Sequence, residues 1–502
     1  MIGDEIKYRI GQAFGFEPTD EQQRAMDVFA EFMTDRDERA VMVLRGSAGT
    51  GKTTLAGAIV KAMRSLRGRL VLLAPTGRAA KVFSLYSGVP AFTIHRRIYR
   101  QKSIDAGMGG FSLNDNLYRD TLFVVDEASM VANQRMQTDG FGSGCLLDDL
   151  IAYVYQGGDT GCRLLLVGDR AQLPPVGEEE SPALQAAVLE GYGLKVYEAE
   201  LNEVLRQSRD SGILYNATVV RSMITHDELT RLPLIRFHGF ADIRMVPGDE
   251  LIEQLASSYS EVGLDETMVV TRSNKRANIY NQGIRNMVLG REEELSTGDM
   301  LMIVKNNYYW VKPPRTTGPK AGAPSLTASV QPAGEGETTP TLTFLANGDR
   351  AKVWRVRNVR ELYGFRFADI TLQLPDYDDY ELTATAVLDS LSTEAPALTP
   401  DQNERLFQAV MEDYADIPLK ANRLKAMKED RFFNALQIKF AYAVTCHKAQ
   451  GGQWAHVYVD QGYMTDDMLT PDYIHWLYTA FTRASEKLYL VNWPKTQTEE
   501  MK

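Results

Sequence analysis

A glycine-rich turn set between an apolar run and a helical pattern restricts the folds open to this chain more than any other segment. The run AVMVL at 40–44 comes before the turn, and TTLAGAIVKAM follows it. The turn matches the pattern G-x-x-x-x-G-K-[ST], in which backbone N–H groups and a helix N-terminus surround phosphate groups. A chance glycine-rich turn would lack both flanking elements. We therefore expect a nucleotide site made by Gly46, Ser47, Ala48, Gly49, Thr50, Gly51, Lys52, Thr53 and Thr54.

A second apolar run, TLFVV at 121–125, ends in the acidic pair Asp126 and Glu127. Such a pair is by itself usually a solvated turn, but at the tip of a parallel strand it can bind a metal and activate water. Beside a phosphate loop the functional interpretation is favoured. Lys52 is expected to contact the β- and γ-phosphates, Thr53 and Asp126 to hold Mg²⁺, and Glu127 to act on the attacking water. ATP and Mg²⁺ are the expected cofactors, although these elements do not say what hydrolysis drives.

The remaining apolar runs indicate an α/β protein with parallel sheets covered on both faces. One set includes 70–76 and 163–169, and a second α/β unit starts near 210. Its segments are TMVVTRSNKRANIYNQGI (267–284), AYAVTCHKAQG (441–451), HVYVDQ (456–461) and KLYLVNW (487–493). Between the sets lie a Pro/Gly/Thr/Ser-rich stretch at 311–340, a predicted antiparallel hairpin (346–361 with 367–374) and a charged helical segment at 400–434.

Composition restricts the environment of the chain more than its chemistry. The 502 residues suggest roughly three or four folded units. No run of about 18 apolar residues predicts a membrane span, and MIGDEIKYRI has no signal-peptide pattern. Three scattered cysteines, Cys145, Cys162 and Cys446, indicate a reducing cytoplasm and neither a zinc site nor a disulfide framework. The net charge of −11 is unfavourable for a nucleic-acid protein, but a groove can be basic while other faces are acidic.

Seven further segments occur in a fixed order, namely APTGRAAK (74–81), TIHR (93–96), VVDEASM (124–130), LLLVGDRAQLPPV (164–176), LNEVLRQS (201–208), TCHKAQGGQW (445–454) and YTAFTRASE (478–486). From about residue 16 to 492 the chain resembles the superfamily 1 helicases, in the 5′-to-3′ branch that contains RecD, Dda and the Pif-type proteins. The resemblance implies two RecA-like P-loop domains with ATP in the cleft between them, a small pin insertion and an inserted β-barrel. The expected boundaries are 1–96 and 119–209 for the first RecA-like domain, 97–118 for the pin, 210–296 and 438–502 for the second domain, and 297–437 for the barrel region.

The resemblance also implies roles for individual residues. Gln22 matches the glutamine that recognises adenine, Gly451 joins the nucleotide-binding set, and Gln172 would couple the γ-phosphate to the DNA site. Arg206 and Arg483 match arginine fingers, which neutralise charge on the phosphate in the transition state. An ordinary surface ion pair is the alternative for either arginine.

The residues implied to face DNA are Pro75, Thr76, His95, Thr445, His447 and Lys448. Side chains of these types suit contacts to phosphate and sugar, which hold a strand without reading its sequence. A packed or solvated histidine is the alternative for His95. Phe111 is a candidate strand-separating wedge at the tip of the pin, and a plain turn residue is an equal alternative.

We therefore expect a cytoplasmic, ATP-dependent DNA helicase that moves 5′ to 3′ on single-stranded DNA and unwinds duplex junctions in replication, recombination or repair. Three alternatives remain open. The chain could be a DNA-stimulated translocase that remodels protein–DNA complexes without unwinding, the helicase subunit of a nuclease complex with a protein partner, or an inactive binding scaffold. The presence of Lys52, Asp126, Glu127, Arg206 and Arg483 argues against the scaffold.

Overall fold

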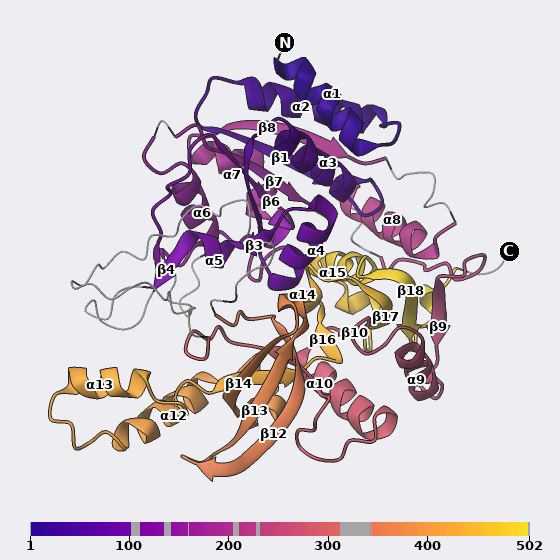
Figure 1. The fold of residues 1–502 in the computed structure, drawn as a ribbon. Coiled ribbons are helices and arrows are strands. Elements are labelled where there is room, and N and C mark those ends of the chain that lie inside the picture. Colours follow the sequence, from indigo (N-terminus) through magenta and orange to yellow (C-terminus); the bar gives the residue numbers. More distant parts are fainter. Residues whose placement is uncertain are drawn as a thin grey trace. The chain divides into compact units, whose positions relative to one another are not determined.

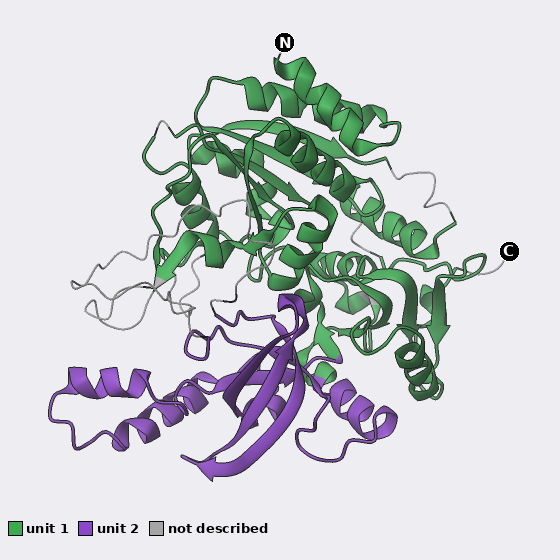
Figure 2. Cartoon of the chain, viewed as in Figure 1, with its two compact units in different colours: residues 1–277, 443–502 green, residues 278–442 purple. Residues whose placement is uncertain are grey.

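The structure is a computed structural model that describes residues 2–101, 111–134, 142–158, 160–203, 210–226, 231–311, 342 and 344–499. The chain forms two compact units, Met1–Ala277 with Ala443–Lys502 and Asn278–Tyr442 (Figure 2). Within the described residues, no helix has both the length and the apolar character needed to cross a membrane. Cys145, Cys162 and Cys446 are buried free thiols.

The first unit contains a six-stranded sheet in the order β3-β2-β6-β7-β1-β8, with every neighbouring pair parallel. The strands are β1 (Ala40–Gly46), β2 (Arg69–Ala74), β3 (Ala91–Thr93), β6 (Thr121–Val125), β7 (Arg163–Gly168) and β8 (Lys195–Leu201). Every second residue, such as Met42, Val124 and Leu165, belongs to one core cluster. The intervening residues are buried too, as Val43 and Phe123 illustrate. Because side chains alternate between the faces of a strand, burial of both sets produces the continuous apolar runs of the sequence.

Helices cover this sheet. The first are α1 (Ile2–Phe14), α2 (Asp20–Thr34), α3 (Lys52–Ser65) and α4 (Gly77–Ser87), which Figure 1 labels beside the sheet. Their apolar side chains share the core cluster with the strands. Then follow α5 (Ile94–Ile98), α6 (Leu146–Val154) and α7 (Ala186–Gly191). Tyr153 of α6 meets Phe123 edge-to-face at 6.0 Å, which places α6 on the side of the sheet opposite the cluster. A capping box of Thr19 and Gln22 starts α2.

The same unit holds a second sheet of five parallel strands in the order β16-β10-β17-β18-β9. Its strands are β9 (Ile243–Val246), β10 (Thr267–Thr271), β16 (Ala443–Thr445), β17 (Trp454–Asp460) and β18 (Ala484–Val491). The helices that accompany it are α8 (Gly212–Thr225), which packs on α15 and β18, α9 (Leu251–Glu261), α14 (Cys446–Ala449) and α15 (Pro471–Phe481). The helix α10 (Asn274–Gly283) begins in this unit and continues into the second. The strands β10 and β16 are separated by the whole of the second unit, so only the folded chain brings them side by side.

A short antiparallel pair, β4 (Tyr99–Gln101) with β5 (Phe111–Leu113), stands in the region expected to form a pin. Phe111 pairs with Gln101, and its carbonyl accepts a hydrogen bond from Gly142 at 2.9 Å. Phe111 therefore lies in a paired strand and not in a turn, and a wedge role for it stays a prediction.

The second unit is built on a closed barrel of β11 (Met300–Ile303), β12 (Arg350–Leu362), β13 (Phe365–Leu374), β14 (Tyr380–Val387) and β15 (Leu436–Phe440). The predicted hairpin is the antiparallel pair β12–β13. The barrel closes where β15 pairs antiparallel with β11 and parallel with β14. Since β15 continues to Phe440, the last barrel strand runs past the boundary expected at residue 437. Closure depends on this long-range pairing, which local sequence pattern does not reveal.

Between β14 and β15 the chain forms α11 (Asp389–Ser392), α12 (Pro400–Glu412) and α13 (Lys420–Lys428). Leu406 and Val410 of α12 and Met427 of α13 share a core cluster with Phe365 and Phe367 of β13. The charged segment predicted to be helical is therefore packed on the barrel by a small apolar face.

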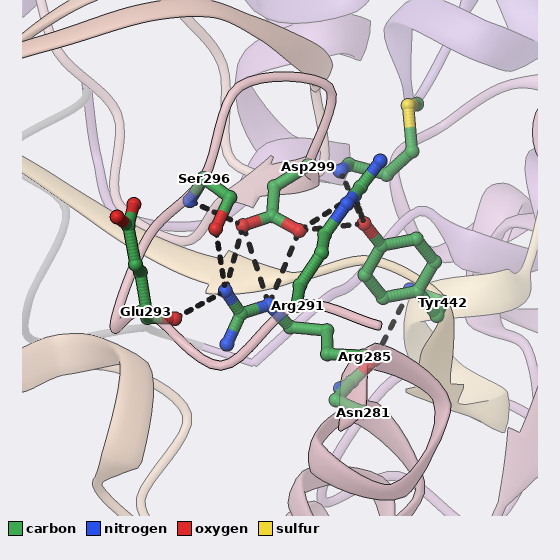
Figure 3. A network of polar contacts seen from close by, with 8 residues as sticks. Asn281, Arg285, Arg291, Glu293, Ser296, Asp299 and Tyr442 are labelled. Atoms are coloured by element: carbon green, nitrogen blue, oxygen red, sulfur yellow. Dashed lines mark hydrogen bonds and ion pairs between the residues drawn. The ribbon is translucent and has the colours of Figure 1, made fainter. Parts of the chain in front are cut away.

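A buried polar network joins the segments of the second unit that precede and follow the barrel (Figure 3). Asp299, which is fully buried, accepts hydrogen bonds from Arg285, from Arg291 at 2.7 Å and from the Tyr442 hydroxyl at 2.8 Å. The backbone N–H of Ser296 donates to the same carboxylate at 2.8 Å. One carboxylate thus pairs with two arginines and fixes the segments 285–299 and 442 to each other.

The predicted fold class is confirmed. The chain is an α/β protein with two parallel, RecA-like sheets, a small antiparallel hairpin and an inserted closed β-barrel.

Candidate nucleotide site

The phosphate loop connects β1 to the N-terminus of α3. Gly49 and Gly51 have φ values of +79° and +76°, a left-handed conformation that costs a residue with a side chain about 1 kcal/mol or more. Thr50 closes the loop on itself, since its hydroxyl donates to the Ser47 carbonyl at 2.9 Å. Lys52 is the first residue of α3 and Thr53 the second. The helix N-terminus therefore points into the loop, as anion binding requires.

Gln22 lies directly against this loop. Its side-chain amide donates to the Thr50 carbonyl at 2.9 Å, and its side-chain oxygen accepts from the Thr19 N–H at 3.0 Å. Only 2% of Gln22 is exposed. The structure therefore shows Gln22 supporting the loop, and its expected contact with adenine stays a prediction.

The acidic pair stands at the end of β6. The backbone N–H of Asp126 donates to the Leu73 carbonyl of β2 at 3.0 Å, and Glu127 adopts a positive φ of 53°. Burial, together with the negative charge of Glu127, raises the pKa of Asp126 to about 6, while the positive charge of Lys52 opposes the shift. Two carboxylates therefore face a single nearby cation. An arrangement of this kind, with a non-glycine residue in the left-handed region, is typical of functional sites.

The loop after β7 forms a third side of the site. Asp169 accepts the Ala171 N–H at 3.0 Å and the Tyr478 hydroxyl at 2.6 Å. Gln172 is 5% exposed. Burial raises the pKa of Asp169, and Lys52 again acts in the opposite direction.

Several buried oxygen atoms of these segments have no hydrogen-bond partner among the described residues. They are Ser47 Oγ, Glu127 Oε2, Ser129 Oγ and Gln172 Oε1. Buried polar groups are normally paired, and leaving one unpaired costs about 1–3 kcal/mol. Their concentration around the phosphate loop indicates a site that is completed by a ligand.

A small pocket at the candidate nucleotide site is lined by residues from the segments around both sheets of this unit. It is lined by Thr53, Ala79, Val82, Tyr86, Asp126, Glu127, Gly451 and Gln453. Gly451 has a φ of +71°, and a Cβ on it would lie 3.0 Å from Thr76 Oγ1 and 3.1 Å from Ala79 Cβ. The close approach of the turn after α14 to α4 therefore requires glycine.

Arg483 lies behind that turn and is 2% exposed. Its guanidinium donates to the carbonyls of Thr479 at 3.0 Å and Gly452 at 3.1 Å. All of these partners belong to the segments around the second sheet, so the finger role of Arg483 stays a prediction. Arg206, the other expected finger, falls outside the described residues.

The residues expected to face DNA are distributed over both sheets of the first unit. Pro75 and Thr76 follow β2, and Thr76 caps α4 by accepting the Ala79 N–H at 3.2 Å. His95 is in α5, with its ring 5.7 Å from that of Tyr99. Thr445 ends β16, and His447 and Lys448 lie in α14. The role of these residues in binding DNA stays a prediction.

Sequence reasoning missed two contacts that join the sheets. Arg78 stacks over Trp454 at 4.6 Å, and its guanidinium donates to the Gln453 carbonyl. Tyr478 contacts Asp169 and also accepts a hydrogen bond from the Ala48 N–H at 3.0 Å. These residues stand inside the segments that carried the resemblance, but their sequence positions gave no sign that they meet.

Comparison with known proteins agrees with this geometry. The family described as "AAA domain" matches residues 18–224, and the "UvrD-like helicase C-terminal domain" matches residues 440–491. The ATP-dependent DNA helicase dda of Enterobacteria phage T4 is 24% identical over 304 residues, covering 57% of this chain and 60% of that protein. The ATP-dependent RecD2 DNA helicase of Deinococcus radiodurans is 34% identical over 139 residues, covering 27% and 16%. The chain thus spans less than two thirds of the length of either relative.

Among solved structures, a Pif1 helicase from Bacteroides in complex with ADP-AlF3 and single-stranded DNA is 14% identical. The match covers 97% of this chain and 95% of that one, with a TM-score of 0.45. At this score the likeness is weak.

The phosphate loop, the acidic pair after β6 and the parallel sheet that holds them define a P-loop nucleoside triphosphatase fold. The first family match covers the strands of the six-stranded sheet, and the second covers three strands of the five-stranded sheet. The chain belongs to the superfamily 1 helicases of the RecD and Dda type.

Proposed function

We propose that this protein is an ATP-dependent DNA helicase. The observation that carries the proposal is a pocket lined from both sides. Thr53 of α3 and the pair Asp126 and Glu127 after β6 belong to the first sheet's elements, and Gly451 and Gln453 precede β17 of the second sheet. A nucleotide held there would contact both sheets of the unit, so its hydrolysis would change their relative position. A motor requires such a difference between its nucleotide states.

The phosphate loop and the acidic pair supply the groups for hydrolysis. Lys52 contacts the β- and γ-phosphates, and the loop N–H groups bind their oxygens. Glu127 orients the attacking water, for which its unpaired Oε2 is suited. Gln172 senses the γ-phosphate, and Arg206 and Arg483 act as the arginine fingers. Arg483 leaves its local carbonyl partners beside the second sheet to reach the phosphate.

The acidic pair fits a magnesium ion. Among the described residues no group of three or more His, Cys, Asp or Glu is arranged to hold a metal. Mg²⁺ is, however, commonly held by one or two carboxylates together with substrate phosphates. The pKa of Asp126 is raised by burial and by the negative charge of Glu127, so a cation between the two carboxylates would be stabilised by both. Glu127 Oε2 also has no hydrogen-bond partner among the described residues. Thr53 and Asp126 would hold Mg²⁺, which would neutralise charge on the phosphates when bound.

Single-stranded DNA is the proposed track. Pro75, Thr76 and His95 beside the first sheet and Thr445, His447 and Lys448 beside the second would contact its backbone. Alternate tightening of these two groups during the nucleotide cycle would move the strand, and the β4–β5 hairpin with Phe111 would separate the duplex ahead. The 5′-to-3′ direction is proposed from the family, whose members named above are DNA helicases.

The test is strand displacement on matched duplexes that carry a single-stranded tail at either the 5′ or the 3′ end. Lys52→Ala removes the phosphate contact, and Lys61→Ala removes an exposed lysine of the same helix as a control. We expect ATP-dependent unwinding from the 5′ tail only, lost in Lys52→Ala and retained in Lys61→Ala.

Each other outcome has a distinct meaning. Unwinding from the 3′ tail would contradict the direction but keep the motor. DNA-stimulated ATP hydrolysis without unwinding of either substrate would contradict the helicase and favour a translocase. Equal activity of Lys52→Ala and the unsubstituted protein would refute the nucleotide site.

A further inference from the structure

Helix α15 presents one face to the loop that follows β7. His475, Tyr478 and Thr479 are spaced three and four residues apart, so they lie on the same side of the helix. His475 Nδ1 is 2.9 Å from the Ala171 carbonyl oxygen, and the Leu173 N–H donates to the Thr479 hydroxyl at 2.7 Å. The Gln450 side chain adds a bond of 2.7 Å to the Leu173 carbonyl. The loop that carries Gln172 is therefore held from the side of the second sheet.

The Tyr478 hydroxyl stands at the centre of this contact. It donates to Asp169 Oδ2 at 2.6 Å and accepts from the Ala48 N–H at 3.0 Å. Tyr478 is 1% exposed and Asp169 4% exposed. Burial and the charge of Asp169 raise the pKa of the phenol well above its usual value, so the hydroxyl remains a donor at all physiological pH values. One oxygen atom thus joins α15, the loop after β7 and the phosphate loop.

We propose that Tyr478 is a positioning residue for ATP hydrolysis, which sets α15 and the arginine that follows it against the phosphate loop. The inference rests on the proposed function. Arg483 lies two residues after the end of α15, so a displacement of the helix also displaces the backbone of Arg483. The register of α15 against Ala48 therefore decides how far the Arg483 guanidinium must travel to reach a γ-phosphate.

Loss of the hydroxyl should affect turnover more than nucleotide binding. The phosphate loop keeps its shape through the Thr50 bond to Ser47 and the Gln22 bond to Thr50, neither of which involves Tyr478. Removing the hydroxyl also frees the Ala48 N–H and does not block it. Only the register of α15 and the orientation of Asp169 lose support.

The test compares Tyr478→Phe with Tyr473→Phe. Tyr473 is on the same helix, is 2% exposed, and donates its hydroxyl to the Gln461 side chain away from the phosphate loop. Each variant loses one buried hydroxyl, so a merely structural role predicts equal effects. The measurement is steady-state ATP turnover at saturating single-stranded oligonucleotide, with kcat per folded molecule and KM determined separately.

We expect kcat to fall about tenfold in Tyr478→Phe with KM within about twofold of the unsubstituted protein, since the loss of one hydrogen bond to a charged group is of this size. Tyr473→Phe should keep its kcat. Equal kcat values in the two variants, or a raised KM with unchanged kcat, would overturn this inference and leave the proposed function intact. Absence of hydrolysis in the unsubstituted protein would overturn the proposed function and the inference with it. If Tyr478→Phe does not fold, Asp169→Asn weakens the same bond, and an unchanged kcat in that variant overturns the inference.

Discussion

Replacing Asp299 by asparagine should destabilise the barrel unit by about 3–5 kcal/mol. Asp299 is fully buried, and Arg285 beside it is 2% exposed. The carboxylate lies 3.0 Å from Arg285 and 2.7 Å from Arg291 (Figure 3). Asparagine keeps the shape but leaves the Arg285 charge in a dry site without a neutralising partner. It also places an amide NH₂ group where guanidinium donors now point.

The magnitude follows from burial, and an exposed pair in the same unit provides the control. Arg366 and Glu294 lie 2.7 Å apart, but their side chains are 44% and 35% exposed. Water solvates both charges when they are separated, so Glu294→Gln should cost only about 0–1 kcal/mol. The ion pairs Asp299–Arg291 and Glu294–Arg366 have the same length of 2.7 Å. The difference in lost stability between the two substitutions therefore measures the effect of burial.

Native-state hydrogen exchange of the strands β11 to β15 measures this difference within the full chain. A loss of about 4 kcal/mol raises the equilibrium for opening roughly a thousandfold. Peptides from β1 to β7 serve as an internal reference and should exchange at unchanged rates. A loss below about 1 kcal/mol in Asp299→Asn, equal to that in Glu294→Gln, would refute the reasoning.

Three further predictions follow from single contacts. Burial lowers the pKa of Lys439 to about 8; Lys439→Met should therefore stabilise the protein by up to about 3 kcal/mol at pH 7. The gain should shrink as the pH rises from about 8 to 10.5, because in this range Lys439 is deprotonated in the folded chain and still protonated in the unfolded chain. A difference in urea stability between the two proteins that does not vary with pH would contradict this prediction. Thr399→Ala removes the capping box of α12 and should cost about 1 kcal/mol, seen as faster exchange of α12 amides; unchanged exchange would count against the cap. Gly451→Ala forces a side chain into a left-handed turn 3.0 Å from Thr76 and should lower ATP turnover severalfold, whereas full turnover would show that the turn can move away from α4.

Local features of the sequence determined the nucleotide site and the type of each sheet. The pattern of residues 46–54 predicts a loop, a helix start and a phosphate-binding lysine within one short segment, and the structure shows the loop and the start of α3 at Lys52. Apolar runs such as 121–125 indicated strands buried on both faces, and the structure confirms them as parallel. The alternation at 346–361 and 367–374 predicted the hairpin β12–β13. Each of these inferences depends on neighbours in the chain, and such neighbours meet in any fold that the segment adopts.

The tertiary structure alone decided which distant residues meet. Tyr478 and Asp169 are 309 residues apart, and no local pattern relates them. Arg483 stands in a segment typical of an arginine finger, yet its guanidinium is satisfied by nearby carbonyls in this structure. The barrel closes through β11 and β15, whose pairing depends on how the intervening chain is arranged. Such contacts arise from packing of whole elements, for which a single sequence carries no local signal.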